Sequence, residues 1–247
     1  MNNNKWIVVT GATGGLGENI AKRLLETGYR VVASGRNEEK LEALFGGYGD
    51  RALRLPWDMS DPETTAGFAD LVFEKAGAVD GLVISAGVSK ILPVTMLKKA
   101  IIDEVFSINA YAPIMLTGAF LKRGRMNPGG SIILLSSLSA HEGAKGLSLY
   151  AASKGALEAF AQAVSAELAQ KGIRINCIAP GMLLTQMTEG FLSNLDGGQA
   201  KQLEDGYPLG FGRPENVTGL VEYLLGDEGK WVTGQTFLLG GGRFSRA

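Results

Sequence analysis

Tyr150 and Lys154 stand four residues apart in a segment of helical periodicity that reads Tyr150-Ala151-Ala152-Ser153-Lys154. Residues at positions i and i+4 share one face of a helix, so the phenol and the ammonium can point into one cleft. A phenol with a pKa of about 10 is a poor acid-base catalyst at neutral pH unless its anion is stabilised. A lysine cation favours the phenolate, so we expect Lys154 to lower the pKa of Tyr150. The pair indicates proton transfer at an oxygen atom, although this spacing alone is common on helices.

Ser137 lies thirteen residues before Tyr150, at the end of a short apolar run that predicts a strand. A hydroxyl in that place can donate a hydrogen bond to a substrate oxygen and stabilise the charge that develops on it. Ser136 and Ser139 are close neighbours that offer the same group. Together, Ser137, Tyr150 and Lys154 suit a reaction in which hydride transfer at carbon accompanies proton transfer at oxygen.

A glycine-rich turn, Thr10 to Gly17, follows the apolar strand Trp6-Ile7-Val8-Val9 and precedes an amphipathic segment from about Leu16 to Glu26. Glycines at such a turn let backbone N–H groups approach a pyrophosphate at the positive end of the helix. The position between strand and helix, at the first crossover, predicts dinucleotide binding rather than an ordinary turn. The candidate contacts in this turn are Gly11, Thr13, Gly14, Gly15, Leu16 and Gly17.

Arg36 follows the second predicted strand, at the place where the two nicotinamide cofactors are told apart. An acidic residue at that strand tip would hold the ribose 2′-hydroxyl of NAD, whereas an arginine suits the 2′-phosphate of NADP. The tip carries no Asp or Glu, and Glu38 and Glu39 read as first-turn helix residues favoured by the helix dipole. We therefore expect NADP(H) as the cofactor, with NAD the less favoured one.

Strands and helices must alternate along the chain to position these residues. The short apolar runs that we assign to strands are Trp6–Val9, Arg30–Ser34, Ala52–Leu55, Gly81–Ile84, Ser131–Leu135, Ile173–Ile178 and Thr236–Leu239. Runs with almost no polar alternation indicate strands buried on both faces. The prediction is a single-domain, doubly wound α/β Rossmann fold over residues 1–247, with a mostly parallel seven-stranded sheet and helices on both faces. The least regular region, about 186–207, is expected to be a substrate loop or lid.

These motifs resemble those of the short-chain dehydrogenase/reductase family over about residues 5–242. The turn has the family's Gly-x-x-x-Gly-x-Gly spacing, and both the Ser137–Tyr150 distance and the Tyr150–Lys154 spacing match. The resemblance implies NAD(P)-dependent interconversion of a carbonyl and a secondary alcohol, with Tyr150 as the acid or base. It also implies that Lys154 binds the nicotinamide ribose, and that Tyr150 lies against the cofactor.

The same resemblance implies further site residues. Asn109 matches a family Asn that holds a water linking the catalytic lysine to solvent, and Ser85 replaces the Asn of the family's Asn-Ala-Gly. That departure removes a side-chain amide that braces the central strand. The implied cofactor contacts are Asp58 and Met59 at the adenine, Ala86 and Gly87 after the central strand, and Pro180, Gly181, Leu183 and Thr185 after the sixth strand.

Composition narrows the function classes. The net charge is −1, the pI is about 6.0, and the basic residues are scattered, so we expect no nucleic-acid partner and no membrane partner. One cysteine and one histidine argue against zinc chemistry and against a Ser-His-Asp hydrolase, so we expect no metal site. No signal peptide and no membrane-length apolar stretch stand out, so a cytoplasmic protein is expected.

Within the family, the chain most resembles the 3-oxoacyl-acyl-carrier-protein reductase group. Two alternatives remain open at this stage: a nucleotide-sugar epimerase or dehydratase with tightly bound NAD(P), and a non-catalytic NAD(P)-binding sensor. The alanine-rich helix from Tyr150 to Leu168 is small and apolar almost all round, which indicates burial on more than one side. We therefore expect a homodimer or homotetramer that acts on a small-molecule carbonyl or alcohol.

Overall fold

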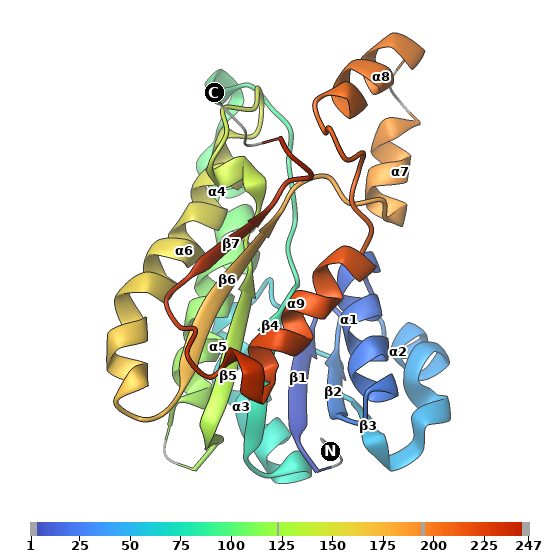
Figure 1. The fold of residues 1–247 in the computed structure, drawn as a ribbon. Coiled ribbons are helices and arrows are strands. Elements are labelled where there is room, and N and C mark those ends of the chain that lie inside the picture. The colour runs from blue at the N-terminus through green and yellow to red at the C-terminus, as the bar shows by residue number, and fades with distance from the viewer. Residues whose placement is uncertain (1–3, 123, 194–195, 244–247) are drawn as a thin grey trace.

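The computed structural model describes residues 4–122, 124–193 and 196–243. Seven strands form one sheet in the order β3-β2-β1-β4-β5-β6-β7, and every neighbouring pair is parallel (Figure 1). The strands are β1 (Trp6–Thr10), β2 (Arg30–Ser34), β3 (Ala52–Arg54), β4 (Val79–Ile84), β5 (Met126–Leu135), β6 (Arg174–Pro180) and β7 (Thr236–Leu239). The seven predicted strands are all present, and the doubly wound parallel sheet is confirmed.

Helices cover both faces of this sheet (Figure 1). They are α1 (Gly15–Glu26), α2 (Glu38–Phe45), α3 (Thr65–Ala76), α4 (Lys99–Phe106), α5 (Ala112–Phe120), α6 (Ser148–Ala169), α7 (Gln186–Leu192), α8 (Gly197–Asp205) and α9 (Glu215–Leu225). Buried residues of α1, α2 and α9 form one core, and those of α3, α5 and α6 form the other. Alternate residues of a strand supply opposite cores, as Ile132 and Ile133 of β5 do.

The strand order reverses between β1 and β4, which pair directly through Ile7–Gly81 to Thr10–Ile84. The chain that leaves β1 enters α1 in one core, whereas the chain that leaves β4 leads to α4, which contacts α6 on the opposite face of the sheet. Ligands of open α/β sheets bind in the crevice at such a reversal. The fold therefore assigns a binding crevice to the carboxyl edge between β1 and β4.

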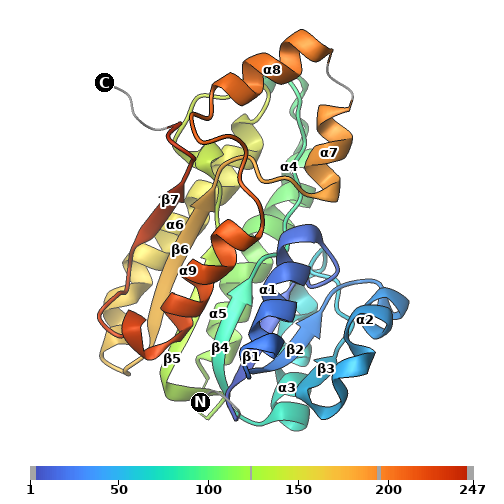
Figure 2. The ribbon, with the colours of Figure 1, turned by 45° about the vertical axis from the view of Figure 1, so that its right-hand side comes forward.

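The region 186–207 differs from the irregular loop expected from the sequence. It contains helices α7 and α8, which rise beyond the carboxyl edge of the sheet (Figure 2). Asp196 accepts a hydrogen bond from the Gln199 backbone N–H at 2.8 Å, and the Gln199 side chain accepts one from the Asp196 N–H. This capping box satisfies the first amides of α8 and begins the helix. Residues 194 and 195 lie outside the described residues.

Candidate active site

A cavity of about 940 Å³ opens at the carboxyl edge of the sheet, at the reversal between β1 and β4. Its walls come from the turn before α1, the ends of β2, β4, β5 and β6, and the start of α6. The residues predicted for cofactor binding that line it are Gly11, Thr13, Gly14, Gly15, Leu16, Gly17, Arg36, Asp58, Met59, Ala86, Gly87, Tyr150, Lys154, Pro180, Gly181, Leu183 and Thr185. The structure therefore brings all of these predicted residues together in one crevice.

Two glycines of the turn between β1 and α1, Gly11 and Gly17, cannot be replaced by another residue without strain. Gly11 has φ of +69°, and a Cβ there would lie 2.8 Å from the backbone N of Ala86. A Cβ on Gly17 would lie 2.3 Å from the carbonyl oxygen of Gly11. The turn and the first turn of α1 thus pack backbone against backbone, next to the chain that leaves β4.

The N-terminus of α1 presents backbone donors to the cavity. Gly14 is the N-cap and supplies no side-chain hydrogen bond, and its carbonyl oxygen accepts a hydrogen bond from Glu18 N–H at 2.7 Å. The amides of Gly15 and Leu16 precede that bond and lack an intrahelical acceptor. With the positive end of the helix dipole, these amides form an anion site that fits a pyrophosphate.

The chain after β2 extends the cavity away from α1. Arg36 is exposed there, and it makes no ion pair or side-chain hydrogen bond with any residue that the structure describes. Asn37 caps α2 by accepting a hydrogen bond from Lys40 N–H at 2.8 Å, and Glu38 and Glu39 lie in the first turn, as predicted. The guanidinium is therefore the available cation at this end of the cavity.

The segment after β3 closes the same end. Met59 is buried, and Asp58 accepts a hydrogen bond from Ser60 N–H at 2.9 Å. Trp57, which the sequence reasoning did not select, also lines the cavity and stacks on Phe68 with ring centroids 4.4 Å apart. Trp57 directly precedes Asp58 in the chain, and this adjacency is the sequence signal that could have identified it as a cavity residue.

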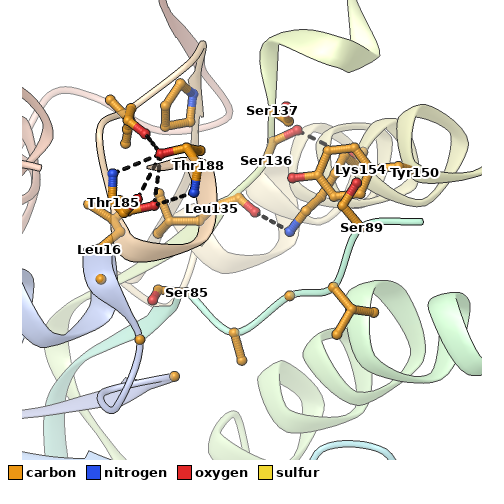
Figure 3. Close-up of a pocket in the computed structure, with 18 of the residues that line it drawn as sticks. Leu16, Ser85, Ser89, Leu135, Ser136, Ser137, Tyr150, Lys154, Thr185 and Thr188 are labelled. Atoms are coloured by element: carbon orange, nitrogen blue, oxygen red, sulfur yellow. Dashed lines mark hydrogen bonds between the residues drawn. The ribbon is translucent and has the colours of Figure 1, made fainter. Parts of the chain in front are cut away.

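Tyr150 and Lys154 project from α6 toward the end of β5, where Ser137 lies (Figure 3). The Nζ of Lys154 donates a hydrogen bond to the Leu135 carbonyl oxygen at 2.8 Å and lies 5.9 Å from the centre of the Tyr150 ring. Ser137 is the last buried residue before the 3₁₀ turn Leu138–Ala140, and its hydroxyl accepts from Ser139 N–H at 3.2 Å. The three predicted catalytic side chains thus meet at one wall of the cavity.

Burial sets the ionisation of this group. It raises the pKa of Tyr150 above its usual value, and a hydrogen bond with the Ser137 hydroxyl only partly opposes the rise. Burial also lowers the pKa of Lys154 to about 8. The pKa of Tyr150 is therefore raised in the ligand-free protein, against the expectation that Lys154 lowers it, because removal of the phenol from water dominates.

Asn109 lies behind this group, in a π-helical turn (Ser107–Tyr111) between α4 and α5. Its side chain is fully buried and makes both hydrogen bonds to the Val88 backbone, at 2.8 Å each, and it donates to the Ser153 hydroxyl at 3.0 Å. The amide thus ties the chain after β4 to α6, next to Lys154. Asn109 does not line the cavity, so its side chain acts here as a brace.

The chain after β6 forms the wall opposite the phosphate turn. A Cβ on Gly15 would lie 2.8 Å from Cβ of Thr185, so this threonine covers the N-terminus of α1. Thr188, one turn further on, accepts a hydrogen bond from Thr185 N–H at 2.8 Å and holds the start of α7 (Figure 3).

Ser85, which follows β4, lies against α1 as well. Its hydroxyl oxygen is 2.6 Å from where a Cβ of Gly17 would stand.

The far end of the cavity holds residues that sequence reasoning missed. Arg243, beyond β7, pairs with Glu142 and lies 4.8 Å from the centre of the Tyr207 ring. The Tyr207 hydroxyl in turn accepts a hydrogen bond from Met182 N–H at 3.1 Å. Apolar side chains, among them Ile91, Leu147 and Leu203, line the same end. These contacts join segments that lie far apart in the sequence, so no local spacing of residues predicts them.

Among the described residues, no group of three or more His, Cys, Asp or Glu side chains could hold a metal ion. No helix within the described ranges is long and apolar enough to cross a membrane.

Comparisons with known proteins agree with this geometry. A family model described as "Enoyl-(Acyl carrier protein) reductase" matches residues 11–243. A 3-oxoacyl-[acyl-carrier-protein] reductase of Rickettsia felis is 33% identical over 239 residues, which are 96% of each chain. The chain belongs to the short-chain dehydrogenase/reductase family, and the resemblance noted in the sequence is confirmed.

Solved structures share the whole fold. A short-chain dehydrogenase from Burkholderia cenocepacia, in complex with NADP, is 30% identical with a TM-score of 0.89, and the match covers 98% of each chain. A variant of actinorhodin polyketide ketoreductase, crystallised with NADPH, is 28% identical with a TM-score of 0.91 over 99% of each chain. The family is one of Rossmann-fold oxidoreductases, and the class of this protein is thereby defined.

Proposed function

We propose that this protein is an NADP(H)-dependent oxidoreductase that interconverts a carbonyl and a secondary alcohol. The observation that carries the proposal is that one cavity joins an anion site at the N-terminus of α1 to the Ser137, Tyr150 and Lys154 group. The cofactor, when bound, supplies or accepts the hydride. The amides of Gly15 and Leu16 would hold its pyrophosphate, and Lys154 would hold its nicotinamide ribose.

Reduction needs a proton at the substrate oxygen, and Tyr150 is suited to give it. Because burial raises the pKa of Tyr150, the phenol is protonated at neutral pH and can donate to a carbonyl oxygen. The Ser137 hydroxyl can donate a second hydrogen bond to the same oxygen and stabilise its developing charge. Lys154, with a pKa of about 8, still carries its proton at pH 7 and stabilises the phenolate left behind.

Arg36 supports NADP(H) over NAD(H). Its guanidinium is exposed at the cavity end and is not engaged by any described acidic side chain. A planar guanidinium binds a phosphate through two hydrogen bonds, which a ribose hydroxyl cannot reproduce. Two solved relatives were crystallised with NADPH and with NADP, and both are consistent with this preference.

The substrate end combines apolar and charged side chains, which suits a carbonyl compound with an apolar portion. The Rickettsia relative is named a 3-oxoacyl-[acyl-carrier-protein] reductase, so 3-oxoacyl thioesters are the first substrate class that we propose. We further propose a cytoplasmic enzyme that acts without nucleic-acid or membrane partners.

The test follows oxidation of NADPH and of NADH separately over 3-oxoacyl thioesters, keto sugars and small ketones. The proposal expects turnover with NADPH on at least one class, and loss of turnover in Tyr150→Phe. Tight NADPH binding without turnover on any class would instead favour a dinucleotide sensor.

Self-association is part of the proposal. Leu157, Ala161 and Leu168 of α6 are buried in the core, whereas Ala152 and Ala159 on its other side are exposed in the single chain. A second copy would cover that small, apolar face and complete the two-sided burial expected from the sequence. Size-exclusion chromatography with light scattering decides this, since a monomer would contradict it.

A further inference from the structure

Three residues of α6 at four-residue intervals meet three consecutive residues at the end of β5. Tyr150 meets Ser137, and Lys154 donates from Nζ to the Leu135 oxygen. Glu158, one turn further along the helix, accepts a hydrogen bond from the Ser136 hydroxyl. The proposed chemistry uses the first two contacts, and the third has no role in it so far.

The Glu158 carboxylate has a second partner. Its Oε1 accepts from Ser136, while its Oε2 lies 2.7 Å from Nε2 of His141. Ser136 and His141 flank the short segment that carries Ser137 and the 3₁₀ turn Leu138–Ala140. One carboxylate therefore anchors both ends of the segment that presents the Ser137 hydroxyl.

The contacts of Glu158 lie in a largely buried part of the protein. The Glu158 side chain is 13% exposed and Ser136 is 5% exposed, so both groups are largely shielded from water. The Ser136 hydroxyl also lies 3.3 Å from the Lys154 carbonyl oxygen, which adds a second contact of the segment with α6. Loss of the Glu158 carboxylate would remove the charged acceptor and leave that weaker contact. The strand supports the same geometry from its other side, since Ser136 N–H donates to the Ile178 oxygen of β6 at 2.7 Å. Leu138, the first residue of the turn, is also buried and leaves the segment little freedom to shift.

We infer that Glu158 is a positioning residue that holds the Ser136–His141 segment against α6 and so sets Ser137 beside Tyr150. The inference rests on the proposed function for its catalytic consequence, but the clamp itself is a property of the ligand-free protein. A displacement of about 1 Å at a catalytic group can cost up to about a hundredfold in rate, so loss of the clamp should be visible in kcat.

The variants are Glu158→Ala, which removes both contacts, and Glu158→Gln, which keeps an oxygen that can accept from Ser136 and a polar group that faces His141. Glu167→Ala is the matched control, because Glu167 is an exposed carboxylate on the same helix. We expect Glu158→Ala to lower kcat about tenfold or more, with the NADPH dissociation constant changed by less than about twofold. Glu158→Gln should retain kcat to within a few-fold, and Glu167→Ala should match the wild type.

A double-mutant cycle separates positioning from general damage. If Glu158 acts through Ser137, then Glu158→Ala should cost little further kcat in a Ser137→Ala background. Equal losses in both backgrounds would overturn the inference. If Glu158→Ala does not fold, His141→Ala, which removes one of the two anchors, takes its place in the same cycle.

A readout without cofactor or substrate completes the test. Amide hydrogen exchange over residues 136–141 should be faster in Glu158→Ala than in the wild type or Glu167→Ala. The imidazole NMR signals, which belong to the one histidine of the chain, should move in both Glu158 variants. Unchanged exchange and unchanged imidazole signals would overturn the inference whatever the activity. Faster exchange in a protein without carbonyl reductase activity would refute the proposed function and leave the clamp in place.

Discussion

The ammonium of Lys154 and the carbonyl oxygen of Leu135 are joined by a hydrogen bond of 2.8 Å at the end of β5. This contact gives the buried cation a partner on the strand that leads to Ser137. The helix and the strand are thus locked together at the residues on which the proposed proton transfer depends.

Burial of Lys154 predicts a pH-dependent stability. Its pKa falls from 10.5 to about 8, so between these values the unfolded chain holds more protons than the folded one. The free energy of unfolding therefore rises with pH in that window, by about 3 kcal/mol from this residue. Relative to Lys154→Met, the wild type should gain stability from pH 8 to pH 10 in urea unfolding. A difference between the two proteins that stays constant with pH would contradict this.

Cys177 should be inert in the folded protein. Burial raises the pKa of its thiol to about 12, so almost none of it is thiolate at pH 8. The low thiolate fraction alone should slow its reaction with a disulfide reagent roughly 1,000-fold compared with the unfolded chain. Because the chain has one cysteine, colorimetric thiol titration in buffer and in denaturant reads this residue directly. Fast labelling of the native protein would show that the thiol is accessible.

Arg36→Ala should selectively weaken the binding of NADPH. Loss of a charge-assisted hydrogen bond to the 2′-phosphate costs about 1.5 to 3 kcal/mol, so the KM for NADPH should rise about 10-fold to 100-fold. The KM for NADH, which lacks that phosphate, should stay within about twofold. Steady-state kinetics with each cofactor measure both values, and Lys40→Ala on the nearby α2 provides the control. An unchanged KM for NADPH would refute the assignment of Arg36.

The Arg243–Glu142 pair should set the preference between charged and neutral substrates at the far end of the cavity. Arg243→Ala leaves the Glu142 carboxylate, whose side chain is 18% exposed, without this partner. The KM of a 3-oxo acid should then rise more than the KM of its methyl ester, while Glu142→Gln should shift the ratio the other way. Parallel changes for acid and ester in both variants would indicate a packing role alone.

The sequence predicted the elements whose signals are local. Seven apolar runs marked the strands, and the spacing of Ser137, Tyr150 and Lys154 marked the site, because helix and strand periodicity project such residues predictably. The start of β5 was missed, since Pro128 and Gly129 are poor strand residues and lie in an irregularity of the β4–β5 register, between the Val79–Met126 and Gly81–Ser131 pairs. Helices α7 and α8 were missed as well, although the Asp196–Gln199 capping box was readable.

Contacts between segments that lie far apart in the chain could not be predicted from the sequence. Glu158 and His141 are seventeen residues apart, and Arg243 reaches Glu142 across 101 positions of the chain. The raised pKa of Tyr150 was likewise not predicted, because desolvation depends on the surrounding fold rather than on spacing.

The most direct test of the proposed mechanism is the turnover number of Tyr150→Phe with NADPH and the best carbonyl substrate of the panel. Removal of the phenol oxygen takes away the proton donor and leaves the anion site at α1 intact. We predict a fall in kcat of about 100-fold to 10,000-fold, with the NADPH dissociation constant almost unchanged. A Tyr150→Phe enzyme that retains the wild-type kcat would contradict the assignment of Tyr150 as the acid.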